Sequence, residues 1–109
     1  MKKSQCYRIV RNPATKANEY VLTPSYLEVF EYNGKEIKIH FHRIEVAPKV
    51  FKWSATEEST ALKCTPDYDT KQACYEAVQG KLEGIITAIA RCNTYIEKLR
   101  DYKEKNNIK

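Results

Sequence analysis

The sequence predicts an α+β fold, in which an antiparallel sheet of about five or six strands, built from hairpins, is packed on one face by a long C-terminal α-helix. Apolar and polar residues alternate through residues 1–65, which is the period of half-buried strands. Through residues 69–105, apolar residues recur every three or four positions, which is the period of an amphipathic helix. A proline-containing turn at residues 65–67 separates these two regions. We expect them to form a single domain over residues 1–109.

The clearest local feature of the first region is Asn33-Gly34 between two alternating segments. Both central residues of a type I′ turn need positive φ, and Asn-Gly supplies them, so we expect a hairpin here. Pro24-Ser25 is expected to end the strand before it. The predicted strands span residues 6–11, 19–23, 26–32, 35–46, 49–55 and 60–64.

The second region carries an unbroken 3,4 repeat and begins at a candidate cap, Asp69 or Thr70. A straight helix over residues 70–104 would be about 52 Å long at 1.5 Å per residue. Because a typical strand spans only about 20 Å, the helix must bend at Gly80 or Gly84, or its second half must find a partner. The flanking heptad positions are mostly uncharged, which favours packing on a sheet over a coiled coil. The repeat consists of Tyr75, Val78, Leu82, Ile85, Ile89, Cys92, Ile96 and Leu99.

The two periodicities together define a predicted core, with one face of each strand and one stripe of the helix turned inward. Its members are Ile9, Val21, Leu27, Val29, Ile37, Ile39, Phe41, Phe51, Trp53, Leu62, Val78, Leu82, Ile85 and Ile89.

Composition narrows the class of protein. Apolar residues make up 42% of the chain and charged residues 30%, which is ordinary globular usage. The formal charge of +5 permits acidic partners or nucleic acid without predicting either. No segment approaches the roughly 20 apolar residues that a membrane span needs, and no signal peptide precedes the first strand. Four scattered cysteines do not form a disulfide framework. We therefore expect a cytoplasmic protein that does not bind membranes.

Enzymatic chemistry is not indicated by any motif. With three glycines, the chain cannot build a phosphate-cradling loop, and it has no nucleophile elbow. His40 and His42 share one face of a strand and are weak candidates for metal ligands, with Cys6 or Cys64 as a third. No zinc-type spacing supports that idea. We predict no enzyme, no cofactor and no metal, with both histidines on the solvent side of an amphipathic strand.

The function that these observations favour is a non-enzymatic protein-binding module, such as a small adaptor or an inhibitor of a larger cytosolic machine. Its contact surface would be the C-terminal helix or a tyrosine-bearing strand, since tyrosine is enriched at binding hot spots. On the helix the candidates are Tyr95, Ile96, Leu99 and Tyr102. The same helix could instead join two copies of the chain.

A nucleic-acid-binding domain is the alternative. Tyrosines on a sheet face can stack on bases, and nearby arginines can contact phosphates. Cross-strand pairing between the tyrosines would explain the same residues without a ligand. The candidates for nucleic-acid contact are Tyr7, Arg8, Arg11, Tyr20, Tyr26 and Tyr32.

Overall fold

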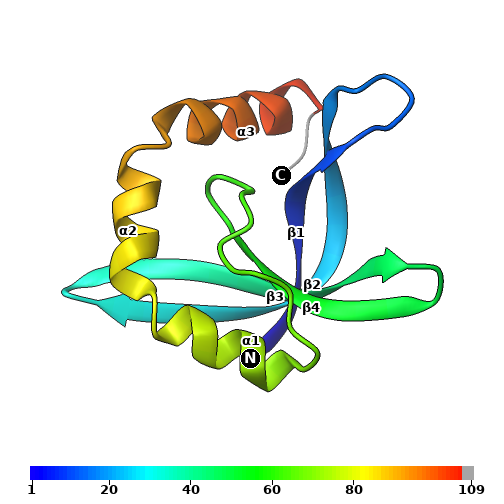
Figure 1. Cartoon of the computed structure of the whole chain (residues 1–109). Coiled ribbons are helices and arrows are strands. Elements are labelled where there is room, and N and C mark those ends of the chain that lie inside the picture. Colours follow the sequence, from blue (N-terminus) through cyan, green and yellow to red (C-terminus); the bar gives the residue numbers. More distant parts are fainter. Residues whose placement is uncertain (107–109) are drawn as a thin grey trace.

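The computed structural model describes residues 1–106 and consists of a four-stranded antiparallel sheet followed by three helices (Figure 1). The strands follow one another in the sheet in the order β1-β2-β3-β4. The α+β class is confirmed, but the predicted five or six strands and single long helix are not. The elements are β1 (Lys2–Arg11), β2 (Asn18–Tyr32), β3 (Lys35–Ala47), β4 (Val50–Glu57), α1 (Lys71–Gln79), α2 (Leu82–Ala90) and α3 (Asn93–Lys105).

Two of the predicted strands are one strand in the structure, because β2 continues through Pro24. At Pro24 the strand has a neighbour on one side only: Pro24 lies opposite Gln5 of β1, and pairing with β3 begins at Tyr26, opposite Phe41. A proline, which has no backbone N–H, is tolerated where a strand has a free edge. The expectation that Pro24-Ser25 ends the strand was therefore wrong.

The last predicted strand, residues 60–64, exists only as a short pairing along the edge of β4. The amide of Cys64 donates to the carbonyl of Ala55 at 3.0 Å, and the amide of Glu57 donates to the carbonyl of Leu62 at 3.0 Å. A single bridge joins Thr56 to Lys63. This segment covers part of the edge of β4 instead of extending the sheet.

The Asn33-Gly34 hairpin is confirmed. Both residues have positive φ, 50° at Asn33 and 77° at Gly34, as a type I′ turn requires. The register continues from Tyr32 opposite Lys35 to Tyr26 opposite Phe41. Beyond that point the sheet divides into two arms, one of β1 with β2 and one of β3 with β4 (Figure 1).

The predicted helical region is helical but turns twice. The first break falls at Gly80-Lys81, whereas Gly84 lies inside α2, and the second falls at Arg91-Cys92. Thr70 is the N-terminal cap, and its Oγ1 accepts a hydrogen bond from the Ala73 amide at 3.1 Å. A straight helix of about 52 Å would overhang a molecule whose extents are 37 × 34 × 24 Å. In the structure, the three helices form an arch that returns to the β1–β2 arm (Figure 1).

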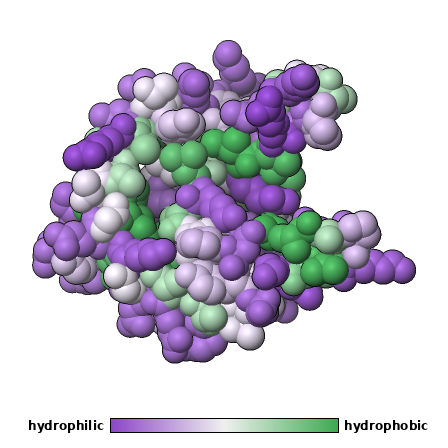
Figure 2. Space-filling model, in the orientation of Figure 1, coloured by the Kyte–Doolittle hydropathy of each residue, from purple (hydrophilic) through white to green (hydrophobic). Residues whose placement is uncertain are grey.

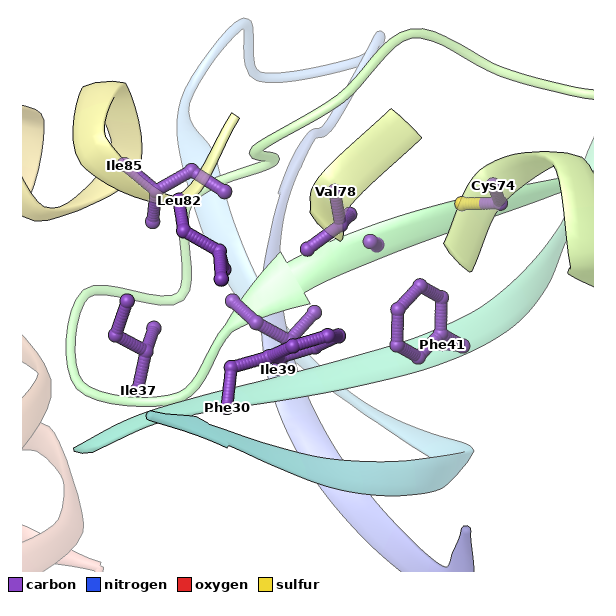
Figure 3. Close-up of a cluster of buried hydrophobic side chains, with 9 residues drawn as sticks. Phe30, Ile37, Ile39, Phe41, Cys74, Val78, Leu82 and Ile85 are labelled. Carbon is purple, nitrogen blue, oxygen red and sulfur yellow. The ribbon is translucent and has the colours of Figure 1, made fainter. Parts of the chain in front are cut away.

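The hydrophobic core lies between one face of the sheet and the helices α1 and α2 (Figure 3). Three predicted core residues are exposed instead: Val21, Val29 and Phe51 are 36%, 45% and 52% exposed. Ile9, Leu27, Trp53, Leu62 and Ile89 are half-buried. The buried core cluster consists of Phe30, Ile37, Ile39, Phe41, Ala55, Cys74, Val78, Leu82 and Ile85.

No helix within residues 1–106 is both long enough and apolar enough to cross a membrane.

Candidate functional site

The predicted interface residues of α3 are divided between the inside of the molecule and its surface. Leu99 is buried, and the Tyr102 ring packs against Tyr7 and Tyr20, with ring centroids 5.6 and 4.8 Å away. Tyr95 is exposed and Ile96 is half-buried. Two of the four candidates therefore attach α3 to its own chain, and only Tyr95 lies fully on the surface.

This division predicts unequal effects of two charge substitutions one turn apart. Leu99→Asp should lower the free energy of unfolding by about 3–5 kcal/mol, because it removes a buried leucine and buries a carboxylate. Ile96→Asp, at a half-buried position, should cost much less. Urea unfolding of the two variants measures the difference. Equal losses would contradict the internal position of Leu99.

The predicted nucleic-acid candidates do not form one surface. Tyr7 and Tyr20 lie beneath Tyr102, whereas Tyr26 lies near α1, where Lys71 Nζ is 4.3 Å from the centre of its ring. Because neighbouring residues of a strand point to opposite faces, Arg8 points away from the face that carries Tyr7. Arg8 Nε donates to Thr23 Oγ1 at 2.9 Å.

The remaining two candidates are equally dispersed. Tyr32 packs against the hydrophobic core, and Arg11 is exposed at the end of β1. The tyrosine and arginine candidates thus belong to several separate environments.

The expected position of the two histidines was wrong, since both are buried. His40 is 0% exposed and lies in a chain of hydrogen bonds: Ser25 Oγ is 2.8 Å from its Nδ1, and Glu58 Oε1 is 3.0 Å from its Nε2. His42 Nε2 lies 2.7 Å from Thr56 Oγ1. These polar partners belong to β2, β4 and the following turn, far from His40 in the sequence.

The two histidines do not form a metal centre with other residues. Across residues 1–106, no group of three His, Cys, Asp or Glu side chains is placed to hold a metal ion. Burial lowers the pKa of His42 to about 4, so its ring is neutral at neutral pH. We interpret the histidines as members of a hydrogen-bonded polar layer within the sheet.

The cysteines are free thiols, and three of them are unreactive because of their surroundings. Burial raises the pKa of Cys64 to about 12 and the pKa values of Cys6 and Cys74 to about 11. The thiolate is the nucleophilic form, so these side chains are poor nucleophiles at neutral pH. Cys6 and Cys74 are small buried residues of the interior.

Several exposed apolar side chains lie at the end of the β3–β4 hairpin, which we call the hairpin tip: Ile44, Val46, Val50 and Phe51. Val46, Val50 and Phe51 are 44%, 48% and 52% exposed, while Ile44 is half-buried. Since β2 pairs with β3 only as far as Phe41, this part of the hairpin projects beyond the rest of the sheet. Figure 2 shows hydrophobic residues gathered on the projecting hairpin.

Charged side chains surround the hairpin tip. Arg43 lies over the Phe51 ring, with its Cζ 5.9 Å from the ring centre, and Glu45 and Lys49 are exposed on the same hairpin. Phe51 lies opposite Glu45 in the strand register and Ile44 lies opposite Lys52, so Phe51 and Ile44 point to opposite faces of the hairpin. Each face of the hairpin tip therefore carries apolar and charged side chains together, as protein contact surfaces do. The sequence contains a signal for the hairpin tip, which is an apolar run interrupted by Pro48. The alternation of residues 49–55 nevertheless led to the prediction that Phe51 lies in the core.

A pocket of about 560 Å³ lies between α2 and the segment that follows β4. Its wall is mostly apolar, and both Gly80 and Gly84 line it. The volume falls within the usual range for small-molecule sites. The residues lining the pocket are Glu57, Thr60, Leu62, Lys63, Cys64, Gly80, Lys81, Glu83, Gly84, Ile85, Ala88, Ile89 and Cys92.

Comparison of the chain with protein-family models, with curated protein sequences and with solved structures finds no match. Any functional conclusion must therefore be argued from the surfaces and pockets of this chain.

Proposed function

We propose that this protein is a non-enzymatic protein-binding module, an adaptor or a small inhibitor of a larger cytosolic machine, that contacts its partner through the hairpin tip. The observation that carries the proposal is the exposure of Val46, Val50 and Phe51 at the end of one projecting hairpin. Leaving three large apolar side chains in water has a free-energy cost, which a partner would remove by covering them. The free thiols support the cytosolic location, since disulfides are rare there.

The chemistry of the other candidate residues also favours binding over catalysis. Ser25, His40 and Glu58 are joined by hydrogen bonds, but His40 is fully buried, so a substrate has no direct access to its ring. The buried thiols of Cys6 and Cys64 are protonated at neutral pH. A buried, hydrogen-bonded group of this kind can stabilise a sheet without supplying a nucleophile.

Protein binding also explains the tyrosines better than nucleic-acid binding does. Tyr7 and Tyr20 pack on Tyr102, and Tyr26 packs near Trp53, with ring centroids 6.2 Å apart. Each ring is thus engaged within the chain, which leaves less surface for base stacking.

If the hairpin tip is the contact surface, a charged side chain introduced there should abolish binding of the partner protein. Val46→Lys and Phe51→Lys should reduce the amount of bound partner by about tenfold or more, since a desolvated apolar anchor is worth roughly 2 kcal/mol or more. The measurement is capture from a lysate of the source organism with tagged chain, after nuclease treatment, with quantitative mass spectrometry of the bound proteins.

Matched control variants are available on β2. Leu22→Lys and Val29→Lys place the same charge at side chains that are 49% and 45% exposed, away from the hairpin tip. They should retain the partner at the wild-type level. If the hairpin and control variants lose the same proteins equally, or if nuclease alone removes the bound material, the proposal is wrong.

A further inference from the structure

We propose that the pocket between α2 and the segment after β4 binds a small organic cation, a compact apolar molecule that carries one protonated amine. The ligand's apolar body would lie against α2, and its ammonium group would interact with Glu57. This site is separate from the hairpin tip, so the inference does not depend on the proposed function.

The walls of the pocket are suited to contact with the apolar part of the ligand. Ile85, Ala88 and Ile89 of α2 line one side, and Leu62 and Cys64 line the other. A volume of about 560 Å³ can hold a molecule with one or two fused rings. Contact with these side chains would supply affinity through burial of apolar surface.

The charge of the ligand is indicated by Glu57, which lines the pocket and is only 5% exposed. Its carboxylate accepts hydrogen bonds from the Ser59 amide at 2.7 Å, the Ser59 hydroxyl at 2.7 Å and the Thr60 amide at 3.0 Å. Among the ion pairs of residues 1–106, none involves Glu57. These hydrogen bonds compensate for part of the cost of burying the carboxylate, but no ion pair does, and an ammonium group in the pocket would add the attraction of an opposite charge.

The other charged side chains that line the pocket should influence the choice of ligand less than Glu57 does, because they are exposed to water. Lys63 is already paired with Asp67, and its side chain is 51% exposed. Lys81 and Glu83 are both exposed and carry opposite charges. Exposed charges are screened by salt far more than a buried one, so Glu57 should decide the sign of the preferred ligand.

Gly84 leaves space in the pocket although the backbone does not require a glycine there. Neither Gly80 nor Gly84 has positive φ, since Gly34 is the only glycine that does. A Cβ added at Gly84 would meet no atom within 4 Å, although glycine inside a helix costs about 1 kcal/mol relative to alanine. The missing side chain at Gly84 therefore leaves space in the pocket at a cost to helix stability.

The test compares three probes that share one ring system: 1-naphthylmethylamine, 1-naphthylmethanol and 1-naphthylacetate. Isothermal titration calorimetry with the full chain should give the amine an affinity about tenfold or more above that of the alcohol, with the acetate weakest. NMR signals of the Ile85 and Ile89 methyl groups should shift on addition of the amine.

Three variants test where the probes bind and which group selects their charge. Gly84→Leu should abolish binding of all three probes while leaving the melting temperature unchanged or raised, because the added side chain occupies the pocket and favours the helix. Thr87→Leu adds the same side chain at an exposed position of α2 outside the pocket and should bind as wild type does. Glu57→Gln should reduce the preference for the amine over the alcohol.

Three results would overturn the inference. One is the absence of saturable binding by any probe at millimolar concentration, and another is unchanged binding by Gly84→Leu. The third is tightest binding by the acetate, which would assign the charge selection to Lys81 or Lys63. Loss of partner capture by the hairpin variants is a separate result, so the two proposals can fail independently.

Discussion

Phe41→Ala is expected to lower the free energy of unfolding by about 3–5 kcal/mol, the usual cost of deleting a buried aromatic ring. Phe41 is 0% exposed and belongs to the core cluster (Figure 3), with the rings of Phe30 and Tyr75 at 6.4 and 5.8 Å. Since a folded domain has a total stability of about 5–15 kcal/mol, the variant should lose a large share of it. The shift of the urea midpoint measures the loss.

Phe51→Ala is the matched control for this substitution. Phe51 is 52% exposed on the hairpin tip, so its removal should change the free energy of unfolding by only about 0.5 kcal/mol. The same variant should lose partner binding, which separates the role of Phe51 in recognition from a role in the fold. Equal destabilisation by the two substitutions would show that the hairpin tip is covered within the chain.

The second large effect is a loss of stability in mild acid, caused by His42. Burial lowers the pKa of His42 from its ordinary 6.5 to about 4 in the folded chain. Between these values the unfolded chain binds a proton that the folded chain does not, so stability falls as pH falls. The full contribution is present above pH 6.5, and about 3 kcal/mol of it is lost by pH 4.

The neighbours of His42 act in the same direction, with one exception. Burial is the largest cause of the lowered pKa, and the positive charges of Arg8 and Lys63 lower it further, as does His40. The nearby backbone of Arg43 acts in the opposite direction. His42→Gln removes the titrating group and should flatten the difference in stability between pH 6.5 and 4, measured by urea unfolding at each pH. Parallel curves for wild type and variant would contradict the assignment to His42.

Local sequence was sufficient for features that depend on neighbouring residues alone. Asn33-Gly34 predicted its hairpin because the turn requires positive φ at two adjacent positions, which few other residue pairs tolerate. The inward positions of Ile37, Ile39 and Phe41 follow from alternation on a strand with one apolar face.

Features that depend on distant segments were not predictable in the same way. His40 looked like a solvent-facing residue because its partners, Ser25 and Glu58, are 15 and 18 positions away. The break of the helical region at Arg91-Cys92 carries no glycine or proline, and it is where the arch of helices turns back toward the β1–β2 arm (Figure 1). Alternation along the strand predicted Phe51 in the core, but its side chain is 52% exposed, and no other element within residues 1–106 covers it.

Photo-crosslinking in the source cells shows directly whether the hairpin tip contacts another protein. Two chains would be compared, one with p-benzoylphenylalanine in place of Phe51 and one with it in place of Val29, which is 45% exposed on β2. If the hairpin tip is the contact surface, position 51 should give a single discrete protein adduct and position 29 none of that mass. An adduct of equal yield from both positions, or adducts only from position 29, would contradict it.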